Sequence, residues 1–79
     1  MKIRVLINTI DSVKDFVNAA NRCNSCDIYV VSGRYVVDAK SIMGIFSLDL
    51  TNELIVYSEN CTEEAFLSFC NDIQKYILG

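Results

Sequence analysis

The sequence predicts a two-layer α+β fold in which helices cover one face of a mainly antiparallel sheet. Strand and helix patterns follow one another in the order βαββαβα, and each segment has one apolar side that only the opposite layer can bury. Apolar residues make up 52% of the chain, which is enough for a globular core. Because 79 residues are too few for two cores, residues 1–79 are expected to form a single domain.

The first half of the chain predicts a strand, a helix and a hairpin. Residues 1–8 alternate between two faces, which is the period of a half-buried strand. A helix capped by Ser12 or Asp11 is expected next. Residues 27–31 and 34–38 are rich in β-branched and aromatic side chains and flank a Ser-Gly turn, so they predict a hairpin. The apolar residues of the helix recur at helical spacing: Val13, Phe16, Val17 and Ala20.

The second half predicts a short helix, a strand and a longer helix. Residues 41–48 form the short helix with Ser41 as its cap, and residues 53–58 form the fourth strand. The last helix is expected to run from about 63 to 78, with Thr62 as its cap and two glutamates in its first turn. Its apolar stripe consists of Phe66, Phe69, Cys70, Ile73 and Ile77.

Composition argues against two classes of partner. The net charge is −3 and only seven Lys and Arg residues are scattered along the chain, whereas a nucleic-acid interface needs a concentrated basic surface. No apolar run approaches the ~20 residues of a transmembrane helix, and the charged alternating start is unlike a signal peptide. We therefore expect a cytoplasmic protein that binds neither nucleic acid nor membrane and holds no cofactor.

The four cysteines are expected to be free thiols. Without a secretory signal they indicate a reducing compartment. Cys23 and Cys26 have CxxC spacing, which can mark a redox pair or half of a zinc site, but this pair follows a helix and precedes a strand. The chain has no histidine, and Cys61 and Cys70 do not form a second CxxC, so no metal site is predicted.

The segment 40–48, Lys-Ser-Ile-Met-Gly-Ile-Phe-Ser-Leu, resembles HPr, the phosphocarrier of the bacterial sugar phosphotransferase system. The order of the predicted elements is similar as well. Further positions that match HPr are Asp27, Ile28, Gly33 and Glu53. The resemblance implies an open-faced sandwich with strand order 1-4-2-3, and partners among the proteins of the phosphotransferase system.

The loop after the first strand departs from HPr. There HPr carries Gly-x-His-Ala-Arg-Pro, whose histidine accepts a phosphoryl group from enzyme I. The matching residues here are Asn8, Thr9, Ile10, Asp11, Ser12 and Val13. Ile10 lies about where the histidine would be, and Ser12 replaces the arginine that would bind the phosphate. Histidine phosphotransfer is therefore not expected; an aspartyl relay through Asp11 is conceivable, although a lone carboxylate there suits a helix N-terminus.

Ser41 matches a regulatory position of HPr. In low-GC Gram-positive bacteria a dedicated kinase, HPr kinase, phosphorylates the serine of the Lys-Ser motif. A phosphate at this helix N-terminus would meet free backbone N–H groups. The alternative is a plain N-cap serine, which stabilises the helix by about 1 kcal/mol and is never modified.

An apolar patch follows Ser41. Ile42, Met43 and Phe46 match the surface by which HPr docks onto its partners, and a flexible methionine beside an aromatic ring is typical of a docking surface. The alternative is that these side chains merely lie flat on the surface, while Ile45 and Leu48 belong to the core.

The outer face of the sheet is predicted to be apolar. If Ile28, Val30, Leu54 and Val56 point to the helices, alternation turns four other side chains outward. These are Tyr29, Val31, Ile55 and Tyr57, and Leu6 of the first strand is expected on the same side. We expect a second copy of the chain, or another protein, to cover this face.

These observations favour an HPr-like regulatory or docking module without phosphocarrier activity, which is not an enzyme. One alternative is a small α+β hydrolase resembling acylphosphatase, which needs arginine and asparagine around a Gly-rich loop. Arg4, Arg22 and Arg34 are instead dispersed over a strand, a helix end and a hairpin. Another alternative is an oligomerising structural domain built on the tyrosine-rich sheet face.

Overall fold

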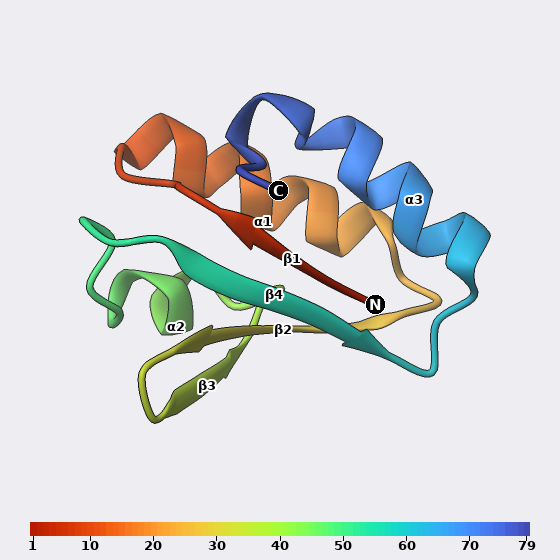
Figure 1. Cartoon of the computed structure of the whole chain (residues 1–79), viewed down its shortest axis with the longest axis horizontal. Coiled ribbons are helices and arrows are strands. Elements are labelled where there is room, and N and C mark those ends of the chain that lie inside the picture. The colour runs from red at the N-terminus through yellow and green to blue at the C-terminus, as the bar shows by residue number, and fades with distance from the viewer.

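Four strands and three α-helices build the predicted sandwich (Figure 1). The computed structural model covers residues 1–79. The elements are β1 (Lys2–Val5), α1 (Ile10–Arg22), β2 (Asp27–Ser32), β3 (Tyr35–Asp38), α2 (Ile42–Phe46), β4 (Leu54–Glu59), α3 (Glu63–Asp72) and the 3-10 helix η1 (Gln74–Tyr76). The strands are antiparallel in the order β1-β4-β2-β3, which confirms the fold class and the strand order. None of the helices combines the length and the apolar character that crossing a membrane requires.

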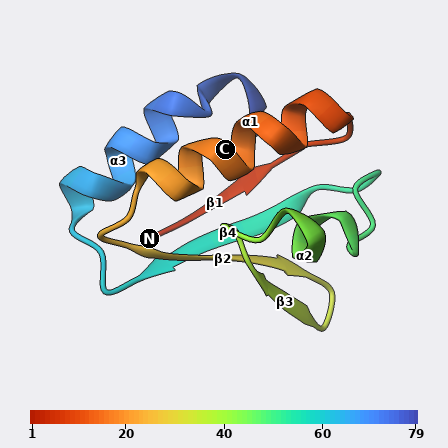
Figure 2. The same cartoon turned by 180° about the vertical axis from the view of Figure 1, so that it is seen from behind.

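The core lies between one face of the sheet and the helices, with α1 and α3 side by side above it (Figures 1 and 2). The predicted inward residues of β2 and β4 are at most 1% exposed, which confirms the alternation. Phe16 of α1 meets Phe69 of α3 edge to face, with ring centroids 5.7 Å apart. Burying each phenylalanine stabilises the fold by roughly 1.5–3 kcal/mol. Burial of these rings therefore joins the two long helices to each other and to the sheet.

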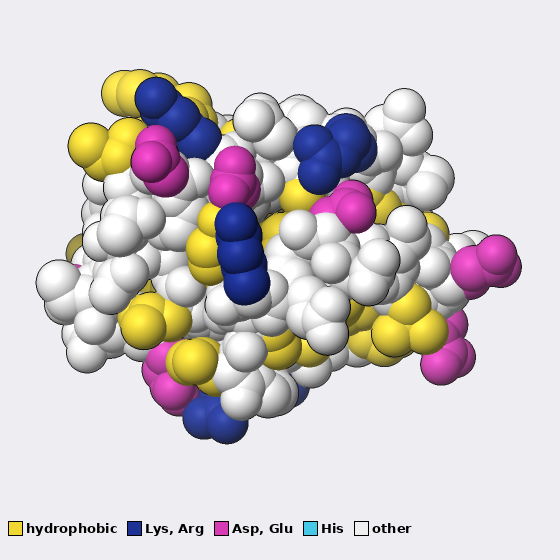
Figure 3. Space-filling view, turned by 90° about the horizontal axis from the view of Figure 1, so that it is seen from above, with side chains coloured by type: hydrophobic (Ala, Val, Ile, Leu, Met, Phe, Trp, Pro, Cys, Tyr) yellow, Lys and Arg dark blue, Asp and Glu magenta, His cyan; other side chains and the backbone are white.

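Two ion pairs connect α1 with the C-terminal helices. Arg22 lies 3.5 Å from Asp72, and Lys75 lies 3.8 Å from Asp15. Basic and acidic side chains are interspersed on this helical face (Figure 3). Exposed pairs of this kind contribute little to stability, so packing rather than charge holds the helices in place.

The start of α1 differs from the prediction. The helix begins at Ile10 and its cap is Thr9, rather than Ser12 or Asp11. The Ser12 N–H donates to the Thr9 hydroxyl at 3.0 Å, and the Thr9 N–H donates to the Ser12 hydroxyl at 3.0 Å. This reciprocal arrangement is a capping box. The prediction was wrong because a serine hydroxyl can act either forward, as a cap, or backward from the third helical position.

The C-terminal helix is shorter than the predicted 63–78. Thr62 is its cap, as predicted, but α3 ends at Asp72, and η1 leads into an extended end that pairs with β1. The Arg4 N–H donates to the Gly79 carbonyl at 2.9 Å, and the Leu78 N–H donates to the Arg4 carbonyl at 2.8 Å. A continued helix would leave the β1 edge unpaired, whereas the extended end satisfies its backbone groups.

Candidate functional site

In the loop that corresponds to the HPr histidine loop, the polar side chains of Thr9 and Ser12 form hydrogen bonds within the loop itself. Ile10 is 64% exposed, while Ser12 is 5% exposed and bonded to Thr9. No imidazole is present in the chain. Two of the arginines that could bind a phosphate are engaged elsewhere, Arg4 with Glu53 at 3.4 Å and Arg22 with Asp72. The loop therefore holds neither a phosphoryl-accepting nitrogen nor an arginine to bind the phosphate.

Ser41 occupies the predicted cap of α2, which begins at Ile42. Its side chain is exposed, and its hydroxyl accepts from the Gly44 N–H at 3.2 Å. Gly44 suits this turn because a Cβ there would lie 3.3 Å from the Ser41 hydroxyl and 3.4 Å from the Val37 Cβ. The glycine thus lets α2 lie close to β3 while Ser41 keeps its capping bond.

The Lys40 side chain reaches the residue before β2. Its ammonium donates to the Cys26 carbonyl at 2.6 Å. The Lys40 carbonyl in turn accepts from the Asn21 side chain at 3.2 Å, and the Lys40 N–H donates to the Asp38 carboxylate at 2.8 Å. These bonds join the start of α2 to α1, β2 and β3.

Helix α2 divides its apolar residues between core and solvent. Ile45 and, just after the helix, Leu48 are buried, as the alternative to docking expected. Met43 is 77% exposed, and Ile42 and Phe46 are also exposed. The three residues of the proposed docking patch therefore lie on the side of α2 that faces away from the core.

The outer face of the sheet carries four half-buried apolar or aromatic side chains. They are Tyr29, Val31, Ile55 and Tyr57. Tyr29 and Tyr57 are cross-strand partners with ring centroids 5.3 Å apart. Burial raises the pKa of Tyr29, and the negative charges of Asp27 and Glu59 raise it further. Lys2, opposite Tyr57, adds a charged side chain at the β1 end of this face.

The cysteines do not all remain free, which corrects the sequence-based prediction. Cys26 and Cys61 form a disulfide, with their Cα atoms 4.5 Å apart, and Cys23 and Cys70 are free thiols. Cys26 precedes β2 and Cys61 follows β4, and the antiparallel ladder sets Asp27 opposite Glu59. The CxxC spacing pointed to Cys23 and Cys26, which are not bonded to each other. The strand order 1-4-2-3 would have indicated the bonded pair, because it places the start of β2 beside the end of β4.

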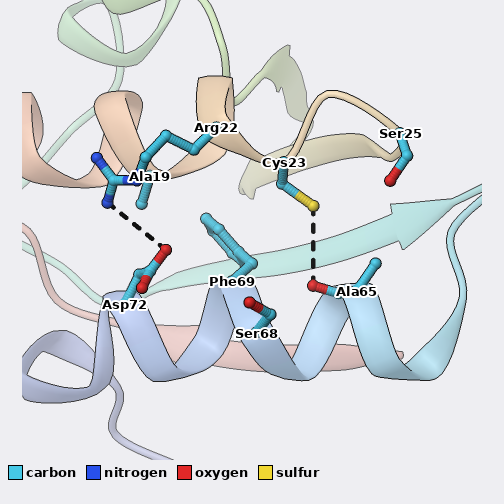
Figure 4. A pocket seen from close by; sticks show the side chains of 8 residues that line it. All are labelled: Ala19, Arg22, Cys23, Ser25, Ala65, Ser68, Phe69 and Asp72. Atoms are coloured by element: carbon cyan, nitrogen blue, oxygen red, sulfur yellow. Dashed lines mark hydrogen bonds and ion pairs between the residues drawn. The ribbon is translucent and has the colours of Figure 1, made fainter.

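Cys23 lies beside this disulfide. The sulfur atoms of Cys23, Cys26 and Cys61 all lie within 4.8 Å of one another. Cys23 also lines a pocket of about 220 Å³ between α1 and α3, which Figure 4 shows with the Arg22–Asp72 pair at its other end. Three thiolates would suit a soft metal ion, but the disulfide occupies two of the three sulfurs. The fourth thiol, Cys70, is outside this cluster, and burial raises its pKa.

Comparison with known proteins identifies relatives. Residues 12–67 match the family model PTS-HPr, described as the PTS HPr component phosphorylation site. HPr-C-His from Thermoanaerobacter tengcongensis is 28% identical, with a TM-score of 0.76 over 95% of this chain and 92% of the other. Phosphocarrier protein HPr from Bacillus anthracis str. Ames is 28% identical, with a TM-score of 0.69 over 94% of this chain and 96% of the other. No curated protein matches the sequence.

Proposed function

We propose a function for this chain that starts from its family: the chain belongs to the HPr family of the bacterial sugar phosphotransferase system. In this proposal it is a docking and regulatory protein of that system and carries no phosphate on histidine. Members of this family are phosphocarriers rather than enzymes, so the alternative of a small hydrolase is set aside. We place the protein in the cytoplasm, with proteins of the phosphotransferase system as its partners.

The absence of histidine carries this proposal. The phosphocarrier chemistry of HPr uses a histidine, the side chain whose unperturbed pKa lies nearest neutral pH, and this chain has none. Here the exposed Ile10 begins α1 at that place, and Ser12 is bonded to Thr9. Asp11 lies in the first turn of α1, where its charge favours the helix without acting as a relay.

The docking surface would be the apolar patch of Ile42, Met43 and Phe46 on α2. Its support is the separation of α2 into a buried side and an exposed side. Met43 is the most exposed of the three, and a flexible thioether adapts to partners of different shape. Such a patch can persist without the histidine, because docking depends on apolar area rather than on phosphoryl chemistry.

Ser41 would be the regulatory site, phosphorylated by an HPr kinase. Two features support it: the side chain is exposed, and its hydroxyl makes a single capping bond that a kinase can displace. A phosphate there would add roughly two negative charges beside the apolar patch. Phosphorylation would thereby oppose docking onto an apolar partner surface.

Intact mass spectrometry tests both statements. The protein is incubated with enzyme I and phosphoenolpyruvate, and separately with HPr kinase and ATP, with an active HPr as the positive control. We expect no added phosphoryl group from enzyme I, and one group from the kinase that Ser41→Ala abolishes. Label from enzyme I would overturn the loss of phosphocarrier activity, and an unlabelled Ser41 would leave a docking role alone.

The outer sheet face favours a further, oligomeric role. Four half-buried side chains form two cross-strand pairs on β2 and β4, one of them a pair of tyrosines with ring centroids 5.3 Å apart, and make up an apolar strip. We propose that a second copy of the chain covers this strip. Light scattering at high micromolar concentration should then give the mass of a dimer, which Tyr57→Lys converts to a monomer. A wild-type monomer at that concentration would contradict the homodimer.

A further inference from the structure

A free thiol and a disulfide meet where three elements converge. Cys23 ends α1, Cys26 immediately precedes β2, and Cys61 lies in the loop between β4 and α3. Their sulfur atoms all lie within 4.8 Å of one another, and only Cys26 and Cys61 are bonded. A third sulfur this close to a disulfide is the arrangement that thiol–disulfide exchange requires.

We propose that Cys23, Cys26 and Cys61 form an intramolecular thiol–disulfide exchange site that releases Cys61 as a reactive thiol. The Cys23 thiol gives its proton to water, and its thiolate attacks the Cys26 sulfur. A Cys23–Cys26 bond forms, the Cys26–Cys61 bond breaks, and its electron pair leaves on the Cys61 sulfur, which takes up a proton from water. The exchange isomerises one disulfide into another, so it needs no oxidant or reductant.

Burial decides which sulfur is attacked. Cys26 is 2% exposed, and besides the other two cysteine sulfurs its sulfur has one hydrogen-bond contact, with the Ser25 hydroxyl at 3.9 Å. Attack on Cys61 would leave a thiolate on this buried sulfur, where desolvation disfavours the charge. Attack on Cys26 leaves the thiolate on the half-exposed Cys61, where water stabilises it. The structure thus favours Cys61 as the leaving group.

Local backbone geometry favours the same product. The Cys26 N–H donates to the Cys23 carbonyl at 3.2 Å, so the CxxC segment is already folded into a tight turn. Cys23 is half-buried and lines the pocket between α1 and α3, with Ser25 at the same end (Figure 4). The turn therefore keeps Cys23 near its target, and its thiol, which donates to the Ala65 carbonyl at 3.8 Å, borders a pocket that is open to solvent (Figure 4).

The exchange has a structural consequence for α3. The Cys26–Cys61 bond ties β2 to the residue before Thr62, whose hydroxyl caps α3 by accepting from the Ala65 N–H at 3.1 Å. A Cys23–Cys26 bond spans only one turn and leaves this connection to the β2–β4 ladder, which ends at Asp27 and Glu59, and to the Asn60–Asp27 hydrogen bond of 3.0 Å. Exchange would thus convert a long-range covalent link into a local one, and present Cys61 to thiol-reactive compounds or to other thiols.

Slow alkylation followed by peptide mapping without reduction tests the proposal. The protein is oxidised with glutathione disulfide, freed of oxidant, and labelled with dilute iodoacetamide under native conditions. In the wild type we expect label on Cys61 together with a Cys23–Cys26 linked peptide. In Cys23→Ser the label on Cys61 should fall by about tenfold or more, because no thiol remains beside the disulfide to displace Cys61. Cys70→Ser is the matched control and should leave the labelling of Cys61 unchanged.

The variant Cys61→Ser tests whether Cys23 and Cys26 are placed to form a disulfide with each other, and it leaves Cys23 unchanged. On oxidation this variant should form the Cys23–Cys26 disulfide, seen as the loss of two hydrogens and as a linked peptide. The proposal is overturned if oxidised wild type contains no Cys26–Cys61 bond, if Cys61 is labelled equally with and without Cys23, or if Cys61→Ser retains free Cys23 and Cys26 after oxidation. Far-ultraviolet circular dichroism confirms that each variant is folded.

Discussion

The starts of α1 and α2 show how differently two helix N-termini on one domain can be used. At α1 a reciprocal pair of hydrogen bonds joins Thr9 and Ser12, and Ser12 is buried. At α2 a single bond joins the exposed Ser41 hydroxyl to Gly44, and apolar side chains follow in solvent. The hydroxyl groups at the first start are thus engaged with each other, whereas the second start presents an accessible hydroxyl and an accessible apolar surface. Under the proposed function, a family member can lack the first site and still use the second.

Reduction of the Cys26–Cys61 disulfide should have the largest effect on stability. It tests the contribution of the scaffold that carries both helix starts, apart from the helix starts themselves. The bond closes a loop of 35 residues. On chain-entropy grounds its loss should lower the free energy of unfolding by up to about 4 kcal/mol. Urea denaturation of oxidised and reduced protein, each in the Cys70→Ser background, measures the difference. Equal stability would show that the bond does not constrain the unfolded chain.

A charge at the start of α2 should weaken partner binding, whereas the same charge at the start of α1 should not. Met43→Asp removes an exposed apolar group from the docking patch, and Ile10→Asp is a matched control because Ile10 is also exposed. We expect Met43→Asp to weaken binding to HPr kinase about tenfold or more. Isothermal titration calorimetry measures both variants. Equal affinities would remove the functional distinction between the two helix starts.

Removal of each cap compares how much the two helix starts contribute to the stability of the fold. Thr9→Ala breaks the reciprocal pair at a helix of 13 residues, and Ser41→Ala breaks one exposed bond at a helix of five. We expect Thr9→Ala to cost about 1–2 kcal/mol and Ser41→Ala about 0.5 kcal/mol. Urea midpoints at constant m-value give the two numbers. A larger loss for Ser41→Ala would mean that α2 depends on its cap more than α1 does.

The smallest effect concerns the loop after α2. Hydrogen bonds from the Thr51 side chain, the Thr51 backbone and the Asn52 side chain lower the pKa of Asp49 below its usual 3.8. A lowered pKa stabilises the folded state above the unfolded-state value, so this contribution is present above about pH 4 and is lost as pH falls below it. Urea unfolding at several acidic pH values should show a slightly weaker acid dependence in Asp49→Asn. An unchanged dependence of stability on pH in Asp49→Asn would show that Asp49 does not contribute to the acid sensitivity of the fold.

Local patterns predicted the strands and the core, whereas contacts between distant segments escaped prediction. Alternation placed Ile28 and Val30 inward correctly, because a strand with one buried face leaves no freedom of register. The end of α3 was missed because its limit depends on hydrogen bonds to β1, far away in the sequence. The bond of Cys26 to Cys61 was missed for the same reason. The sequence could identify Ser41 and the apolar residues of α2 as candidates, but their exposure depends on how α2 packs on β3.

Lys40 gives the Lys-Ser pair an unexpected electrostatic character. Its ammonium is held by the Cys26 carbonyl at 2.6 Å and therefore serves the scaffold rather than the surface. A negative charge placed on the neighbouring Ser41 would receive no counterion from this lysine as long as that bond is kept. Such a charge would meet only backbone N–H groups on this side, without a side-chain counterion, at the rim of an apolar surface. It would repel an acidic partner and favour one that supplies an arginine.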